Sequence, residues 1–113
     1  FIFYIYFGTD TEKMAKALKV IHRELKKLRD NALGTVQLHQ AKQRFIGQIA
    51  LGEENRMGLI ISMAKSYLDY NRVDTLEEVF EKISAVTSAR ILEIANEILD
   101  TGMLTQLLFE PED

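Results

Sequence analysis

The chain opens on seven consecutive apolar residues, FIFYIYF, at positions 1–7. An unbroken run of aromatic and β-branched residues is typical of a strand that is buried on both faces. Such a strand needs neighbouring strands on each side, and no polar residue precedes this one. We therefore expect residues 1–7 to form a strand of a sheet, and the chain to be a fragment of a larger protein.

A different pattern begins after Gly8, where apolar residues recur at the steps of three and four that mark an amphipathic helix. Thr9 and Glu12 have the spacing of a capping box, which predicts a helix from about residue 10 to residue 29. We also expect Gly8 to turn the chain from strand to helix with a positive φ. The apolar stripe of this helix consists of Met14, Ala17, Leu18, Ile21, Leu25 and Leu28.

Two further helices are predicted in the middle of the chain. Thr35 is placed to cap the first of them, which we expect to end near Gly52. The second runs from Glu53 to an exit at residues 70–72. Its apolar residues are numerous enough to predict a central position in the fold.

The last part of the chain predicts two helices and a strand. Thr75 and Glu78 form another capping box ahead of a short fourth helix. A fifth helix starts at residues 86–88 and stops at Gly102. Residues 103–109 are apolar at most positions, so we expect a second strand there.

These elements predict an α+β fold in which two strands flank about five helices. Two strands alone do not bury the apolar surface of five amphipathic helices, because a sheet usually needs three or more strands to be stable. The remaining strands are therefore expected outside this chain. Residues 1–113 are interpreted as a single segment, one half of a domain built from a sheet and helices.

Composition limits the classes of function. The chain is 47% hydrophobic and 27% charged, and its net charge of −3 predicts neither a nucleic-acid partner nor an anionic membrane partner. It has no cysteine, which excludes a thiol protease and a cysteine-based zinc site. The compartment stays open.

The sequence offers candidate functional residues but no catalytic, cofactor-binding or metal-binding site. His22 and His39 are the only histidines, and they fall on different predicted helices, so we interpret both as partly exposed helix residues rather than zinc ligands. Three glutamate pairs, Glu53 with Glu54, Glu77 with Glu78 and Glu110 with Glu112, are interpreted as solvated. The basic face of the first helix, Lys13, Lys16, Lys19, Arg23 and Lys26, is also interpreted as solvated. Arg56, Tyr67, Tyr70 and Arg72 offer a polypeptide-contacting surface, although snorkelling side chains at a helix end are the favoured interpretation.

Several passages carry a family resemblance in their order. The first run is followed by GTDTEKMAKALKVIHRELKKL and then by GTVQLHQAKQRFIGQIALGEENRMG, with the pair Ala41 and Lys42 and the break at Glu53 and Glu54. Next come TLEEVFEKISAVTSARILEIANEIL, with Ile83, Ala85, Val86, Thr87 and the central Ala95, and LLFEP, which ends at Pro111. In this order the passages resemble the second half of a domain of the pitrilysin/insulinase family of zinc metallopeptidases.

The resemblance implies a two-lobed enzyme whose homologous α/β domains face each other around a chamber for unfolded peptides. One lobe carries an H-x-x-E-H motif, a distal glutamate and zinc, and a later lobe contributes substrate contacts. In the family all these elements precede the strand with which this chain begins. The resemblance therefore assigns no catalytic, cofactor-binding or metal-ligating residue here. It implies a non-catalytic scaffold and chamber wall, inactive alone, with zinc in the catalytic lobe of the parent protein.

Partners implied by the resemblance are the rest of the parent chain or a homologous lobe, and a peptide substrate through the parent. The acidic end at residues 110–113 favours the C-terminal lobe. Two alternatives stay open. The parent is a non-proteolytic partner or structural subunit of the same family, or the chain is a helical interaction module that forms a homo-oligomer through its first strand.

Overall fold

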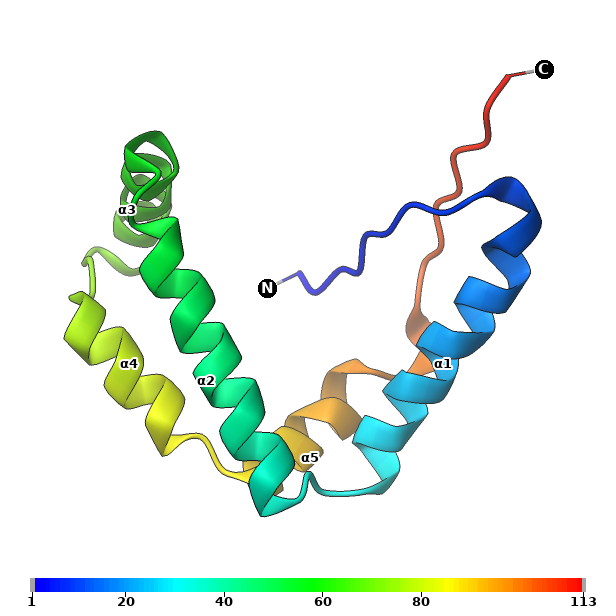
Figure 1. Cartoon of the computed structure of the whole chain (residues 1–113), viewed down its shortest axis with the longest axis horizontal. Coiled ribbons are helices and arrows are strands. Elements are labelled where there is room, and N and C mark those ends of the chain that lie inside the picture. Colours follow the sequence, from blue (N-terminus) through cyan, green and yellow to red (C-terminus); the bar gives the residue numbers. More distant parts are fainter. Residues whose placement is uncertain (1, 113) are drawn as a thin grey trace. The chain divides into compact units, whose positions relative to one another are not determined.

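The computed structural model describes residues 2–112, so Phe1 of the first predicted strand and Asp113 of the acidic end lie outside the described residues (Figure 1). The described chain contains five α-helices, as predicted. They are α1 (Met14–Asp30), α2 (Thr35–Gly52), α3 (Arg56–Tyr70), α4 (Leu76–Ala85) and α5 (Ser88–Ile98). Two short 3₁₀ turns, η1 (Thr11–Lys13) and η2 (Thr101–Met103), flank the outer helices.

The predicted α+β class is wrong, because residues 2–112 contain no strand. The two segments expected to be strands, residues 1–7 and 103–109, follow irregular paths over their described parts, apart from the 3₁₀ turn that includes Met103 (Figure 1). A strand requires the main-chain N–H and C=O groups of a neighbour, and neither segment finds one in the described chain. The composition of the two segments was typical of strands, but composition does not supply that neighbour.

The start of α1 also differs from the prediction. Asp10, not Thr9, takes the N-cap position of η1, and its carboxylate forms an ion pair with Lys13 at 2.9 Å. The expected capping box between Thr9 and Glu12 is therefore wrong. The strained turn conformation expected at Gly8 is wrong as well, because no described glycine has a positive φ.

The boundaries of the inner helices follow local signals closely. Helix α2 ends at Gly52, as predicted, but the cap expected at Thr35 is wrong, because Gly34 takes the N-cap position and Thr35 is the first residue of the helix. Asn55 caps α3 by accepting a hydrogen bond from the Gly58 N–H at 3.0 Å. Asn71 ends α3 in the left-handed conformation, with φ 53°, which asparagine tolerates better than most residues.

The chain divides into two compact units, and the first combines α1 and α5 with both terminal segments. Its core consists of Leu25, Ala95 and Leu99, with Ile21, Leu28 and Ile98 packed against it. Polar contacts join the same two helices. Asn96 Nδ2 donates to the Arg29 main-chain oxygen at 2.9 Å, and the Arg29 guanidinium donates to the Leu99 main-chain oxygen. Apolar packing and these two reciprocal bonds hold α1 against α5.

The second unit, Gly34–Ser88, contains α2, α3 and α4. Helices α2 and α4 lie side by side (Figure 1), and Lys42 Nζ on α2 donates to the Ser84 main-chain oxygen on α4 at 2.7 Å. The prediction that α3 is central is wrong, because most of its apolar side chains are exposed. Among the described residues of this unit, none is fully buried.

No helix formed by residues 2–112 combines the length and the apolar character needed to cross a bilayer.

Candidate functional site

The histidines do not form a site together. His22 lies on α1 and His39 on α2, in different units, and both are exposed, as the sequence analysis expected. Over residues 2–112, no three His, Cys, Asp or Glu side chains come together in a way that could hold a metal ion.

Much of the basic face of α1 is paired with carboxylates of its own neighbourhood. Glu24 accepts from Lys27 at 3.1 Å and from Arg23 at 3.3 Å, and Lys26 pairs with Asp30. The hydrogen bond from Lys27, with a smaller contribution from Arg23, lowers the pKa of Glu24. These exposed local pairs support the interpretation of a solvated face.

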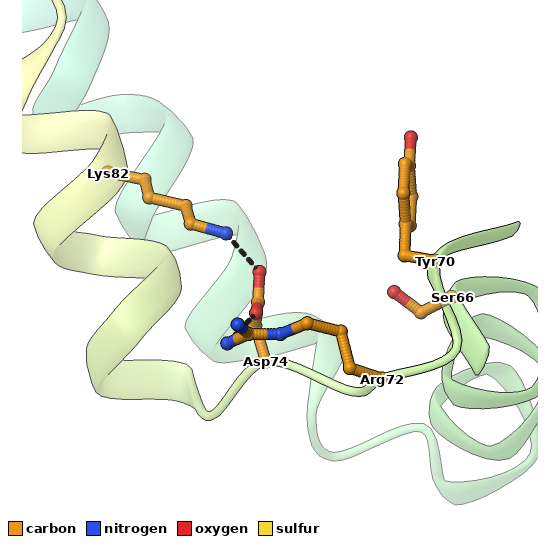
Figure 2. Close-up of a pocket in the computed structure, with 5 residues that line it drawn as sticks. All are labelled: Ser66, Tyr70, Arg72, Asp74 and Lys82. Carbon is orange, nitrogen blue, oxygen red and sulfur yellow. Dashed lines mark hydrogen bonds and ion pairs between the residues drawn. The ribbon is translucent and has the colours of Figure 1, made fainter.

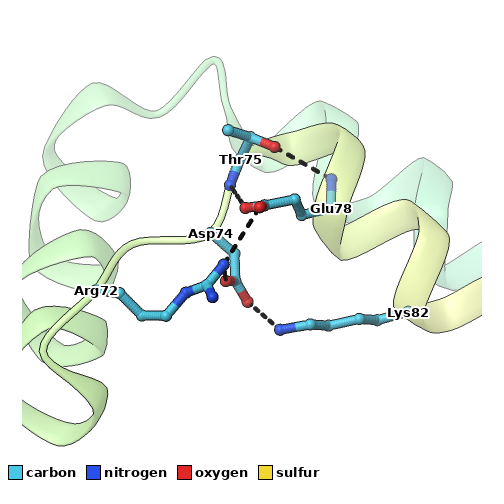
Figure 3. Close-up of polar contacts among 5 residues, drawn as sticks. All are labelled: Arg72, Asp74, Thr75, Glu78 and Lys82. Carbon is cyan, nitrogen blue, oxygen red and sulfur yellow. Dashed lines mark hydrogen bonds and ion pairs between the residues drawn. The ribbon is translucent and has the colours of Figure 1, made fainter.

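The densest polar cluster lies between α3 and α4. We call it the Asp74 cluster, and it consists of Arg72, Asp74, Thr75, Glu78 and Lys82 (Figure 3). The left-handed Asn71 ends α3 and directs the chain into a short connection that carries Arg72 and Asp74. Thr75 then caps α4, so that Glu78 lies in its first turn and Lys82 in its last.

Thr75 and Glu78 form the predicted capping box. The Glu78 N–H donates to Thr75 Oγ1 at 3.2 Å, and the Thr75 N–H donates to Glu78 Oε2 at 2.8 Å. Two main-chain donors at the start of α4 that lack partners within the helix are thereby satisfied.

Asp74 lies between two cations. Lys82 Nζ donates to Asp74 Oδ2 at 2.5 Å, and Arg72 Nη2 lies 2.6 Å from Oδ1 and 3.2 Å from Glu78 Oε1. Oδ1 is itself buried, and its contact with Arg72 is an ion pair without a well-directed hydrogen bond. The hydrogen bond from Lys82, followed by the charge of Arg72, holds the pKa of Asp74 below its ordinary value, although partial burial opposes this.

Three residues of the cluster, Arg72, Asp74 and Lys82, also border a pocket of about 340 Å³. It is lined by Ser66, Tyr70, Arg72, Asp74 and Lys82 (Figure 2). Ser66 and Tyr70 come from the last turns of α3, whereas Lys82 reaches across from α4 toward Asp74 (Figure 2). The pocket lies entirely within the second unit.

This arrangement offers hydrogen-bond donors and positive charge. These groups can hold a ligand through hydrogen bonds and charge.

Part of this cluster was predictable from the sequence. The capping box was predicted, and Tyr70 and Arg72 were expected at the end of α3, whereas Asp74 and Lys82 were not among the candidate residues. The usable signal was the spacing of four between Glu78 and Lys82, which places both on one face of a helix. The position of Asp74 depends on the turn before α4, and no motif in the sequence specifies that turn.

Comparisons with protein-family models, with curated proteins and with solved structures give no match for this chain.

Proposed function

We propose that this chain is a non-catalytic scaffold and chamber-wall portion of a zinc-dependent metallopeptidase of the pitrilysin/insulinase type, which acts on peptides or unfolded polypeptides. The order of the sequence passages given above supports the family. The apolar surface that the chain leaves exposed supports the scaffold role. In this proposal zinc belongs to the catalytic lobe of the parent protein.

The observation that carries the scaffold role is the contrast between a small core and a large exposed apolar surface. Among the described residues only Leu25, Ala95 and Leu99 are buried hydrophobics. Large exposed apolar side chains are found in both terminal segments and along α3; they include Ile2, Tyr4, Tyr6, Met57, Ile60, Tyr67, Leu68, Leu107 and Phe109. Soluble monomers rarely expose apolar patches of more than a few hundred Å², and larger ones mark interaction sites. We therefore expect another part of a larger protein to cover this apolar surface.

The exposure pattern of the terminal segment before α1 supports the scaffold role. Tyr4 and Tyr6 are 79% and 88% exposed, whereas Phe3 and Ile5 are each 45% exposed and Phe7 is half-buried. This alternation turns one row of side chains toward the first unit and leaves the other row in solvent. The solvent-facing row supports contact with another part of a larger protein.

The metallopeptidase assignment is tested by zinc analysis of the parent protein and of this chain. We expect about one zinc per catalytic lobe in the intact parent and no stoichiometric zinc in the 113-residue chain. A parent gene without an H-x-x-E-H motif would contradict the peptidase proposal.

That outcome would favour the second candidate, a non-proteolytic partner or structural subunit. The exposed apolar surface supports both candidates equally, because it calls for a partner and not for chemistry. Copurification of a zinc-free parent with a catalytically active homologue would distinguish the second candidate from the first.

The scaffold role has its own test, a titration with a dye that fluoresces on exposed apolar surface. We expect strong dye binding by the chain alone and a large decrease when the preceding part of the parent protein is added. Equal dye binding with and without the rest of the parent would overturn the scaffold role, whatever the zinc content.

A further inference from the structure

The pocket beside the Asp74 cluster has more hydrogen-bond donors than acceptors to match them. The contacts described for Arg72 within residues 2–112 use a single guanidinium nitrogen, Nη2. A guanidinium carries five N–H groups, so those on Nε and Nη1 stay available. Lys82 spends one of its three ammonium hydrogens on Asp74, and the hydroxyls of Ser66 and Tyr70 line the same pocket.

The carboxylate oxygens of the cluster offer a ligand little, because each faces a cation or an N–H donor, and Asp74 Oδ1, which lacks a well-directed hydrogen bond, is buried. Both oxygens of Asp74 face cations, Glu78 Oε1 faces Arg72, and Glu78 Oε2 accepts from the Thr75 N–H. A ligand that supplies donors would compete with these contacts. A ligand that supplies acceptors would instead accept hydrogen bonds from the unused donors of Arg72 and Lys82. The pocket therefore suits an oxyanion.

The two carboxylates also hold the cations in place. Arg72 and Lys82 are 58% and 67% exposed, and long side chains this exposed are normally mobile. Asp74, which is only 22% exposed and sits between them, restrains both. Because the cations are already positioned, a bound anion loses less side-chain entropy.

Tyr70 indicates what should carry the anion. Its side chain borders the pocket (Figure 2). Tyr70 is 73% exposed and belongs to the same helix as the exposed apolar residues Met57, Ile60 and Tyr67. An exposed tyrosine next to cations is typical of surfaces that contact polypeptides, since its ring gives apolar contact and its hydroxyl a hydrogen bond. A free inorganic anion would use the cations and leave the ring without a role.

We propose that this pocket binds a carboxylate of an extended polypeptide, with Arg72 and Lys82 on the carboxylate and Tyr70 against the adjoining residue. The carboxylate is either the C-terminus of the peptide or an acidic side chain. The choice of a polypeptide rests on the proposed function, whereas the choice of a carboxylate rests on the donors of the pocket. The pocket would give the proposed chamber wall a preference for acidic or C-terminal segments.

The test is a titration of the full 113-residue chain with short peptides, followed by amide chemical shifts in NMR spectra. One peptide has a free C-terminus and no acidic side chain, a second is its C-terminal amide, and a third is the amide with a central glutamate. We expect the first or the third to shift residues 66–82 and the plain amide to bind at least tenfold more weakly. The first and third peptides separate the two sources of the carboxylate.

Lys82→Gln should weaken binding of the carboxylate peptide about tenfold, the effect of losing one charge-assisted hydrogen bond. Lys65→Gln removes the same charge from an exposed position on α3 outside the pocket, so it should leave binding unchanged. Because Lys82→Gln also loosens Asp74, Tyr70→Ala provides a variant outside the ion pairs. Tyr70→Ala should weaken binding of the peptide but leave binding of acetate unchanged.

Equal binding of the acid and amide peptides would overturn the proposal. So would tighter binding of inorganic phosphate than of any carboxylate peptide, or equal effects of Lys82→Gln and Lys65→Gln. All these results are read on this chain alone. They are independent of the zinc content of the parent, so a failure here is distinguishable from a failure of the metallopeptidase assignment.

Discussion

Asn96 on α5 donates a hydrogen bond from Nδ2 to the main-chain oxygen of Arg29, one residue before the end of α1, at 2.9 Å. The same nitrogen also donates to the Leu92 oxygen of its own helix at 2.8 Å. One side-chain amide therefore ties the last turn of α1 to α5. The residues on either side of this contact, Ala95 and Leu99, belong to the core of the unit.

Asn96→Ala should destabilise the first unit by about 1 kcal/mol, because one hydrogen bond between helices is lost. The higher helix propensity of alanine offsets a smaller part of this effect. Urea denaturation followed by circular dichroism measures this. Glu97→Ala, at the exposed neighbouring position, is the matched control and should change the midpoint little. Equal midpoints for the two variants would mean that the Asn96 bond contributes nothing.

Leu25 carries much of the small core, so truncating it should cost more than truncating any exposed leucine. Leu25 is 6% exposed and Leu68 is 83% exposed. Leu25→Ala should lower the free energy of unfolding by roughly 2–3 kcal/mol through lost burial and an incompletely filled cavity. Leu68→Ala should change it by less than about 0.5 kcal/mol, because surface substitutions usually do. Comparable losses in urea denaturation would contradict the assigned core.

The capping box at Thr75 gives a third prediction. Thr75→Ala removes the acceptor for the Glu78 N–H and should destabilise the second unit by about 1 kcal/mol. Hydrogen exchange should show faster exchange at the first amides of α4. Ser62→Ala, at an exposed position inside α3, is the control, since alanine is favourable there. Unchanged protection of α4 in Thr75→Ala would argue against the cap.

The capping boxes show what local sequence determines and what it leaves open. Thr75 and Glu78 were predicted to cap α4 and do so, because both partners lie within one turn. Thr9 and Glu12 have the same spacing, yet Asp10 takes the N-cap position of η1. The Asp10 carboxylate makes no capping hydrogen bond there and pairs with Lys13 instead, so the spacing of Thr9 and Glu12 alone does not determine where the helix begins.

The prediction of strands in the two terminal segments was wrong for a different reason. An apolar run predicts burial, but a strand forms only where another main chain supplies hydrogen bonds, and in residues 2–112 the two segments have no such neighbour. The Asp74 cluster was missed for a similar reason, because it depends on contacts that form only in the folded chain. Asp74 and Lys82 are eight positions apart, and only the turn before α4 brings them together.

The pH dependence of stability should report on Asp74. Its pKa in the folded chain is lower than the ordinary value of 3.8, chiefly because of the hydrogen bond from Lys82. The unfolded chain therefore binds a proton here more readily than the folded chain. The stabilisation from Asp74 is fully present above pH 3.8 and is lost as the pH falls through the lower, folded pKa.

An NMR titration of the Asp74 carboxyl carbon measures this directly, and its midpoint should lie below 3.8. Lys82→Met should raise the midpoint toward 3.8, because it removes the largest cause of the shift. Lys65→Met, on α3 outside the cluster, should leave the midpoint in place. A midpoint that does not respond to Lys82→Met would show that the ion pair does not persist in solution.

The apolar face of α3 gives the last prediction. Met57, Ile61 and Leu68 are 69%, 50% and 83% exposed, and their spacing places them on one side of the helix. Exposed apolar patches of this kind promote association. The double variant Met57→Lys with Leu68→Lys should therefore reduce self-association of the chain in sedimentation velocity, while lysine keeps the helix intact.

The control for this variant is Ser62→Lys with Asp69→Asn. It brings the same change of two in net charge but alters the polar side of α3. Both variants move the net charge from −3 to −1, so general repulsion between chains weakens in both and does not by itself cause dissociation. If the apolar face causes association, the control will still associate while the double variant dissociates, and circular dichroism will show equal helix content in both. Sedimentation that is unchanged in both variants would rule out α3 as the associating surface.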